Sequence, residues 1–127
     1  MSGADDPGMP STGLVNQRDR ERAQRFIPAL DRGDYVAIED GEDIVILPLT
    51  ALVLRIGRSP AAGLTLDDAT VSRRHAVLLR DDTGVRVLDD RSLNGVWVND
   101  ERVTAAVLRD GDVIELGRVR LHYLKRA

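Results

Sequence analysis

The feature that most constrains the fold is a series of short apolar runs, several of which alternate strictly between apolar and polar residues. Nine such runs follow one another from Asp34 onward: DYVAIED, EDIVILPL, ALVLRIG, GLTLDD, HAVLLRDD, VRVLDD, GVWVND, DVIELG and VRLHYL. A period of two places alternate side chains on opposite faces of a strand. Turn residues that recur about every ten positions are typical of β-sandwiches and barrels. We therefore expect an all-β domain.

The run near the C-terminus shows this pattern most clearly, because three apolar residues alternate there with three polar ones: Val119, Leu121 and Tyr123 with Arg118, Arg120 and His122. Asp40-Gly41 separates the first two runs and predicts a turn. Aromatic residues make up only 3% of the chain, so the expected core is aliphatic. No long helical pattern interrupts the strands, which argues against a parallel-sheet nucleotide fold.

The N-terminal quarter has a different organisation. Residues 1–15 are polar, contain Gly, Pro, Ser and Thr, show no periodicity, and predict a mobile tail. The segment 16–33 predicts a short helix or linker, in which Asn16 caps the first turn and Pro28 ends the helix. The third part, 34–126, is the expected β-sandwich domain.

Composition excludes several classes of function. The 127-residue chain has 18 basic and 21 acidic residues and a formal charge of −3, unlike a domain that neutralises nucleic-acid phosphates. It contains no cysteine, which excludes disulfides and thiolate chemistry. The polar N-terminus does not resemble a secretory signal, and no apolar run reaches the roughly 20 residues of a membrane span. We expect a soluble, cytoplasmic protein that acts neither on nucleic acid nor in a membrane.

A serine and a histidine lie three positions apart in the stretch VSRRH, residues 71–75. A catalytic pair would require hydrogen-bond contact between the Ser72 hydroxyl and the His75 ring, together with a third group that orients the ring. His75, however, begins the apolar run HAVLL, so we expect its side chain to be partly buried, and the chain has no G-x-S-x-G turn. We predict no catalytic residue and no enzyme.

Three aspartate pairs stand at strand ends: Asp67-Asp68, Asp81-Asp82 and Asp89-Asp90. Convergent carboxylates can hold a cation, but aspartate is also an ordinary turn residue, and we expect the turn role here. The loop GRSPAAG lacks the lysine and the helix of a nucleotide phosphate loop. We therefore predict neither a metal nor a cofactor.

The pattern favours a receptor for an anion on a peptide. Arg58 follows Gly57 at the end of an apolar strand, and Ser72 and Arg73 stand in a loop before another strand. A hydroxyl and two guanidinium groups are the donors that the three oxygens of a phosphate require. Asn94, in a third loop, can donate to and accept from a peptide backbone beside that phosphate.

These motifs resemble, in order and spacing, the forkhead-associated (FHA) domain. The quoted residues are GRS, VSRRHA, DDRSLNGVWVN and LRDGDVIELG, and the similarity runs from about Asp34 to Leu124. The resemblance implies a two-sheet β-sandwich whose loops bind phosphothreonine in partner proteins. It further implies that Arg58 and Ser72 bind the phosphate, that Arg73 adds a contact, and that Asn94 holds the peptide main chain.

The resemblance also implies supporting residues, which are His75 bracing the loops and the turn glycines Gly57 and Gly95. One position departs from the family pattern, because Leu93 stands where a small hydroxyl residue is frequent. Ser92, one position earlier, is the candidate to replace it in peptide binding. The hairpin after Val98 has Asn-Asp where Asn-Gly is usual.

We therefore expect a non-enzymatic, bacterial phosphothreonine reader that acts downstream of Ser/Thr kinases, with a kinase or its substrates as partners. One alternative is a phosphate-independent scaffold that uses the same sandwich, with the N-terminal segment as its docking element. Another is self-association, in which Thr12 of the tail is phosphorylated and occupies the site in the same or a neighbouring molecule.

Overall fold

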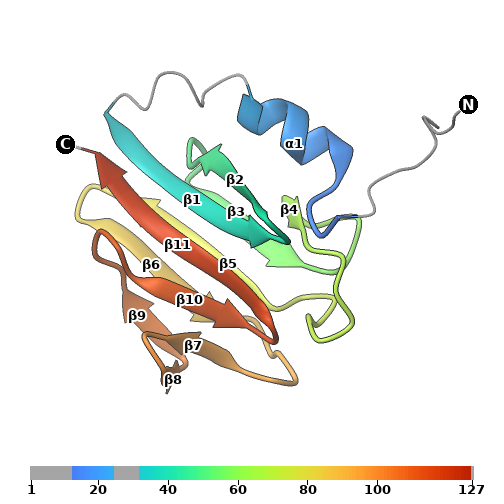
Figure 1. The fold of residues 1–127 in the computed structure, drawn as a ribbon. Coiled ribbons are helices and arrows are strands. Elements are labelled where there is room, and N and C mark those ends of the chain that lie inside the picture. Colours follow the sequence, from blue (N-terminus) through green and yellow to red (C-terminus); the bar gives the residue numbers. More distant parts are fainter. Residues whose placement is uncertain (1–12, 25–31, 127) are drawn as a thin grey trace, which may run out of the picture.

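Two β-sheets stack face to face in the computed structural model, which describes residues 13–24 and 32–126 (Figure 1). The six-stranded sheet has the order β2-β1-β11-β10-β7-β8, and the five-stranded sheet has the order β4-β3-β5-β6-β9. The elements are α1 (Gln17–Gln24), β1 (Gly33–Asp40), β2 (Asp43–Pro48), β3 (Val53–Gly57), β4 (Leu64–Thr65), β5 (Ala76–Asp81), β6 (Gly84–Asp89), β7 (Val96–Val98), β8 (Glu101–Val103), β9 (Ala105–Val107), β10 (Val113–Leu116) and β11 (Val119–Arg126). The expected two-sheet β-sandwich is confirmed.

The core lies between the sheets and is built from the inward faces of their strands. In β11, Val119, Leu121 and Tyr123 are buried while Arg120 is exposed, as is Arg118 just before the strand, as the alternation predicts. The other large side chains that are almost fully buried are mostly aliphatic: Ile38, Leu47, Ile56, Leu64, Leu66, Ile114 and Leu116. Their removal from water supplies the main favourable free energy of the fold, at about 25 cal/mol per Å² of apolar surface.

Two short strands have no counterpart among the nine expected runs. β8 forms a hairpin with β7, and the two turn residues, Asn99 and Asp100, have φ angles of 49° and 71°. Two consecutive left-handed residues match the twist of a two-residue hairpin, and Asn and Asp tolerate this conformation better than most side chains. β9 pairs with the edge of β6 and completes the second sheet.

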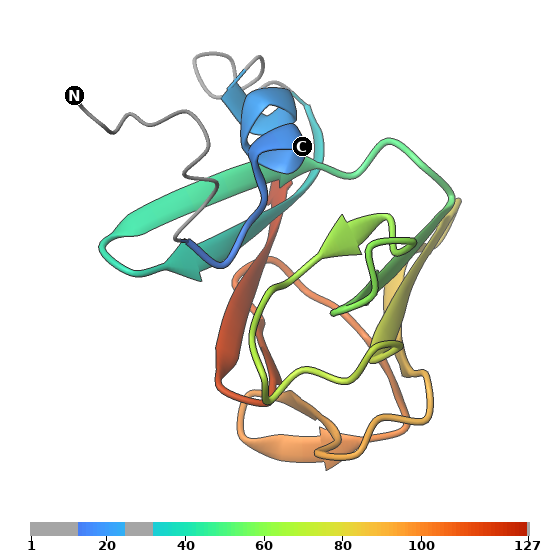
Figure 2. The same cartoon turned by 90° about the vertical axis from the view of Figure 1, so that its right-hand side faces the viewer.

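The helix begins as predicted and packs on β2 (Figures 1 and 2). Asn16 caps it, because its Oδ1 accepts a hydrogen bond from the backbone N–H of Asp19 at 2.9 Å. The helix is described as far as Gln24, so the predicted end at Pro28 lies outside the described residues. No helix in the described ranges has the length and apolar character needed to cross a bilayer.

The last three residues assigned to a mobile tail belong to the folded domain. Val15 is fully buried and forms a β-bridge with Leu66. The carboxylate of Asp40 accepts the backbone N–H of Leu14 at 2.7 Å and that of Val15 at 3.1 Å, and Arg20 pairs with the same carboxylate. A buried acceptor for two backbone donors is therefore what extends the ordered domain beyond the predicted boundary.

Candidate functional site

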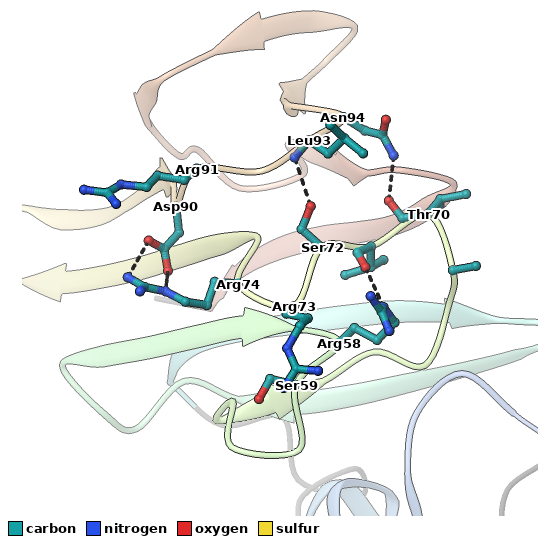
Figure 3. A pocket seen from close by; sticks show the side chains of 12 residues that line it. Arg58, Ser59, Thr70, Ser72, Arg73, Arg74, Asp90, Arg91, Leu93 and Asn94 are labelled. Atoms are coloured by element: carbon teal, nitrogen blue, oxygen red, sulfur yellow. Dashed lines mark hydrogen bonds and ion pairs between the residues drawn. The ribbon is translucent and has the colours of Figure 1, made fainter.

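A pocket of about 630 Å³ lies among three loops that follow β3, precede β5 and precede β7 (Figure 3). Its walls are formed by Arg58, Ser59, Ala69, Thr70, Val71, Ser72, Arg73, Arg74, Asp90, Arg91, Leu93 and Asn94. Four of the eight residues proposed from the sequence line this pocket: Arg58, Ser72, Arg73 and Asn94. Gly57, His75 and Gly95 lie behind it, and Ser92 is not among the lining residues.

Arg58 stands directly after β3 and is anchored at two points. Its backbone N–H donates to the carbonyl of Ser72 at 2.9 Å, and its side-chain Nε donates to the carbonyl of Val71 at 3.0 Å. The Nε contact fixes the plane of the guanidinium group. The N–H donors of both Nη groups remain available to a ligand, because these groups have no hydrogen-bond or ion-pair partner among the described residues. The arginine is thus pre-positioned to bind an anion in the pocket.

The loop 72–75 runs against the end of β3 at very close range. Besides the hydrogen bond from Arg58 to Ser72, the backbone N–H of Ser59 donates to the carbonyl of Arg73 at 3.1 Å. The backbone N–H of His75 donates to the carbonyl of Ile56 at 3.0 Å. A Cβ at Gly57 would lie 2.1 Å from the carbonyl oxygen of Arg73. Glycine is required at this position because the two backbones approach too closely for any side chain.

His75 is fully buried, and its two ring nitrogens connect two loops. Nδ1 accepts the backbone N–H of Ser72 at 3.1 Å, and Nε2 lies 2.7 Å from the carbonyl oxygen of Gly95. A carbonyl can only accept, so the proton sits on Nε2 and Nδ1 is the acceptor. The histidine therefore holds the loop before β5 against the loop before β7, and it is more buried than the sequence suggested.

The Ser72 hydroxyl does not contact His75. Its Oγ instead accepts the backbone N–H of Leu93 at 2.9 Å. This contact uses one lone pair of Oγ and leaves the O–H free to donate into the pocket. The geometry expected of a nucleophile and its base is absent from this pair, and the hydroxyl is placed as a hydrogen-bond donor to a ligand.

Asn94 reaches across the pocket to the loop before β5, two positions ahead of Ser72. Its Nδ2 donates to the carbonyl of Thr70 at 2.8 Å (Figure 3). Oδ1 has no partner among the described residues and remains an acceptor for a peptide N–H. The predicted contact to a peptide main chain is compatible with this orientation, but one donor of the amide is already used.

Thr70 is a site residue that the sequence analysis missed. Its Oγ1 lies 2.5 Å from Oδ1 of Asp68 and accepts the backbone N–H of Arg118 at 2.8 Å. The Thr70 hydroxyl, followed by the Thr70 backbone N–H, lowers the pKa of the Asp68 carboxyl below its ordinary value. The spacing Asp-x-Thr was the available signal, because an aspartate commonly accepts the N–H two residues later in a turn.

Ser92 occupies a different place from the one proposed for it. Its Oγ accepts the backbone N–H of Gly95 at 2.9 Å, and its own N–H donates to Asp89 at 2.8 Å. The hydroxyl therefore closes the turn that carries Asn94, and the side chain faces the loop rather than the pocket. Leu93 does line the pocket, and the residue is 85% exposed.

Three more arginines, Arg73, Arg74 and Arg91, enlarge the basic wall of the pocket. Arg73 extends from the loop 72–75 toward Ser59 at one side of the pocket, and it has no ion-pair partner among the described residues (Figure 3). Arg74 makes a two-point contact with Asp90, with Nε–Oδ2 and Nη2–Oδ1 distances of 3.1 and 3.0 Å. This hydrogen-bonded pair raises the pKa of Arg74 above its ordinary value. Asp90 thus neutralises one arginine and leaves the others available.

The predicted aspartate turns are present at all three strand ends. Asp68 accepts the N–H of Thr70 and Asp81 that of Thr83, each at 2.8 Å, in addition to the Asp89–Ser92 bond. Each carboxylate is thus used by its own turn. Within the described ranges, no group of three or more metal-ligating side chains is arranged to hold an ion.

Comparison with known proteins agrees with this geometry. The family model for the FHA domain matches residues 54–117. Glycogen accumulation regulator GarA of Mycobacterium tuberculosis is 43% identical over 76 residues, which cover 60% of this chain and 47% of GarA. This chain therefore matches only about half the length of that relative.

Solved structures show the same fold. An FHA domain from a study of phosphothreonine-dependent FHA interactions superposes with a TM-score of 0.69 and 32% identity, covering 74% of this chain and 97% of that one. Mycobacterium tuberculosis EmbR in complex with a low-affinity phosphopeptide gives a TM-score of 0.67 and 36% identity, covering 73% of this chain and 25% of EmbR. With half of its length matched by the family model, the chain belongs to the FHA domain family.

Proposed function

We propose that this protein binds phosphothreonine-containing segments of partner proteins and acts downstream of Ser/Thr kinases as a binding module, not as an enzyme. The observation that carries the proposal is the convergence of Arg58 and Ser72 on one pocket, with the Nη groups and the hydroxyl proton unused by the protein itself. The phosphopeptide bound to the related EmbR supports the same choice of ligand.

In this proposal, Arg58 and Ser72 bind the phosphate, Arg73 adds a third donor, and Asn94 holds the peptide backbone through its free Oδ1. Each charge-assisted hydrogen bond contributes about 1.5–3 kcal/mol. Two or three of them supply most of the roughly −8 kcal/mol that corresponds to micromolar affinity. We assign Ser92 to the supporting set with Gly57, His75 and Gly95, because its hydroxyl closes the turn before β7.

The methyl group of threonine gives a reason for preferring phosphothreonine to phosphoserine. Burying one methyl group contributes about 0.8 kcal/mol, which is a several-fold preference. Val71, Ala69 and Leu93 are the apolar residues that line the pocket and could receive it. A larger preference would have to come from the shape of the pocket.

A binding assay tests the proposal with matched peptides that carry threonine, phosphothreonine or phosphoserine. We expect the phosphothreonine peptides to bind and the unphosphorylated ones not to bind. Arg58→Ala should reduce affinity by at least about tenfold, or roughly 1.4 kcal/mol. Arg120→Ala is the matched control, because Arg120 is an exposed arginine of β11 that does not line the pocket. Equal binding of phosphorylated and unphosphorylated peptides would contradict the proposal.

The phosphate-independent scaffold remains a second hypothesis, and the structure bears on its docking element. The described part of the segment 16–33 is packed on the sandwich, where Ala23 and Asp19 are buried and Arg20 pairs with Asp40. These side chains are thus used within the domain and are not presented to a partner. Self-association through Thr12 stays a proposal, because that residue lies outside the described residues. A cytoplasmic location is likewise inferred from the expected kinase partners.

A further inference from the structure

A second pocket adjoins the candidate phosphate site and has the same basic character. It encloses about 380 Å³ and shares four residues with the first pocket, Ser59, Arg73, Arg74 and Asp90. Its other lining residues are Arg55, Ile56, Ala61 and Ala62. In Figure 3, Arg73 and Arg74 lie on the side of Ser72 that is away from Asn94 and Thr70. The second pocket is therefore an extension of the site in the direction opposite to Asn94.

Two of the three arginines around this second pocket have no acidic partner. Arg74 is paired with Asp90, whereas neither Arg55 nor Arg73 has an ion pair with any described residue. The strand register explains why Arg55 has no acidic partner. Its neighbour on β5 is Val77, and the next residue across, on β6, is Leu88. Arg86 on the same sheet is different, because it pairs with Asp81 at 3.5 Å.

The charge of the combined site exceeds what one phosphate can neutralise. The two pockets together are lined by five arginines and one aspartate, a net charge of +4, in a chain whose formal charge is −3. A phosphothreonine carries about −1.5 to −2 charges at neutral pH. A single phosphate in the first pocket would thus leave roughly two positive charges unmatched, and Arg55 is the arginine found only in the second pocket.

We propose that the second pocket binds a second anionic group of the same peptide, either an acidic side chain or another phosphate. Arg55 and Arg73 are its cationic ligands, and Ser59 offers a hydroxyl whose Oγ already accepts the N–H of Ala61 at 3.1 Å. Ala61 and Ala62 leave room for the group because their side chains are small. This inference rests on the proposed function, and it specifies which phosphothreonine partners the protein prefers.

Fluorescence anisotropy on the full chain, with a series of short peptides, tests this inference. Each peptide has one phosphothreonine in a neutral background, and a glutamate or a second phosphothreonine is placed in turn at each position on either side. We expect one narrow range of positions, on one side only, to increase affinity by about fivefold or more relative to the singly phosphorylated neutral peptide. The increase should fall with added salt, because the arginines are exposed.

Arg55→Ala separates the second pocket from the first. It should leave the affinity for the singly phosphorylated neutral peptide within about twofold of the wild type and abolish the increase that the second anion gives. Arg55→Lys should retain part of the increase, because it keeps the charge. Arg86→Ala is the matched control on the same sheet, outside both pockets, and should retain the whole increase.

The outcomes distinguish this inference from the function on which it rests. An increase with glutamate identifies an acidic side chain as a ligand, an increase only with the second phosphothreonine identifies a second phosphate, and either one supports the inference. If singly phosphorylated peptides bind but no position gives an increase, or if the increase persists in Arg55→Ala, the second site is overturned and the proposed function stands. If no phosphothreonine peptide binds, both are overturned.

Discussion

Gly57 lies so close to Arg73 that a Cβ at position 57 would be 2.1 Å from the Arg73 carbonyl oxygen. This approach allows the backbone N–H groups of Arg58 and Ser59 to bond the carbonyls of Ser72 and Arg73. The two loops that supply the proposed phosphate ligands are thus connected by their backbones. The spacing between the Arg58 guanidinium and the Ser72 hydroxyl depends on this connection and on the absence of a side chain at position 57.

Gly57→Ala should therefore lower both stability and affinity. Because a backbone carbonyl cannot move aside cheaply, we expect a loss of about 1–3 kcal/mol in the free energy of unfolding, measured with urea. We also expect at least a tenfold weaker affinity for phosphopeptides. Gly63→Ala is the control, because its Cβ would meet the end of the flexible Leu54 side chain at 2.9 Å. An equal effect of the two variants would contradict the assigned role of Gly57.

His75 should be the most important buried polar side chain for the shape of the site. His75→Ala removes an acceptor for the N–H of Ser72 and a donor to the carbonyl of Gly95, and it leaves a cavity. We expect a loss of about 2–5 kcal/mol in thermal or urea unfolding. His122→Ala is the comparison, since His122 is half-buried on the outer face and contacts Glu39 at 2.6 Å. That variant should cost less than about 1 kcal/mol.

The pH dependence of stability should include a contribution from Asp68. Its pKa lies below the ordinary value of aspartate, chiefly because the Thr70 hydroxyl and the Thr70 N–H bond to its carboxylate. A lowered pKa in the folded state means that the stabilisation is complete above the unfolded pKa, about 3.9, and is lost as the pH falls through the folded pKa. Asp68→Asn keeps an oxygen acceptor but removes the charge.

The difference in unfolding free energy between wild type and Asp68→Asn should be about 1 kcal/mol at neutral pH and should shrink below about pH 4. Urea titrations at a series of pH values measure it. Asp82→Asn is the control, because Asp82 is exposed and has no interaction with other described residues. A difference for Asp68→Asn that does not change with pH would show that the carboxylate charge has no part in holding the turn.

The strands that the sequence predicted are those that can be recognised from the apolar and polar pattern of their own residues. Apolar alternation in β6 and β11 requires a buried face, whatever the neighbouring strands are. β8 and β9 could not be predicted in this way, because each has three residues and is a strand only through pairing with β7 or β6. Val15 was missed for a similar reason, since its order depends on Asp40, 25 positions away.

The same distinction applies to the candidate site. Arg58, Ser72 and Asn94 could be proposed because their residue types and loop positions are local properties of the chain. The contacts Leu93–Ser72 and Asn94–Thr70 could not, since they join a backbone group to a side chain more than 20 positions away. The hydroxyl of Ser92 was assigned to the ligand because its type fitted. In the structure, the Ser92 side chain, one position before Leu93, is directed toward Gly95. The residue type alone does not predict the direction in which a side chain points.

Asp40 offers a way to perturb the N-terminal segment without touching the proposed phosphate site. Asp40→Ala removes the acceptor of two backbone N–H groups, those of Leu14 and Val15, and the ion-pair partner of Arg20. Leaving these donors without an acceptor should lower the free energy of unfolding by about 2 kcal/mol. Phosphopeptide affinity should stay within about twofold of the wild type, because none of these residues lines the first pocket.

Asp43→Ala is the matched control for that variant, because Asp43 faces the same arginine at 3.9 Å from an exposed position. Its effect on unfolding should be below about 0.5 kcal/mol, since exposed ion pairs contribute little. Unfolding is measured by urea titration, and affinity by anisotropy at a temperature where both variants are folded. If Asp40→Ala weakened phosphopeptide binding as strongly as Arg58→Ala, the N-terminal segment would be part of the recognition surface. The division between a structural segment and a binding face would then be wrong.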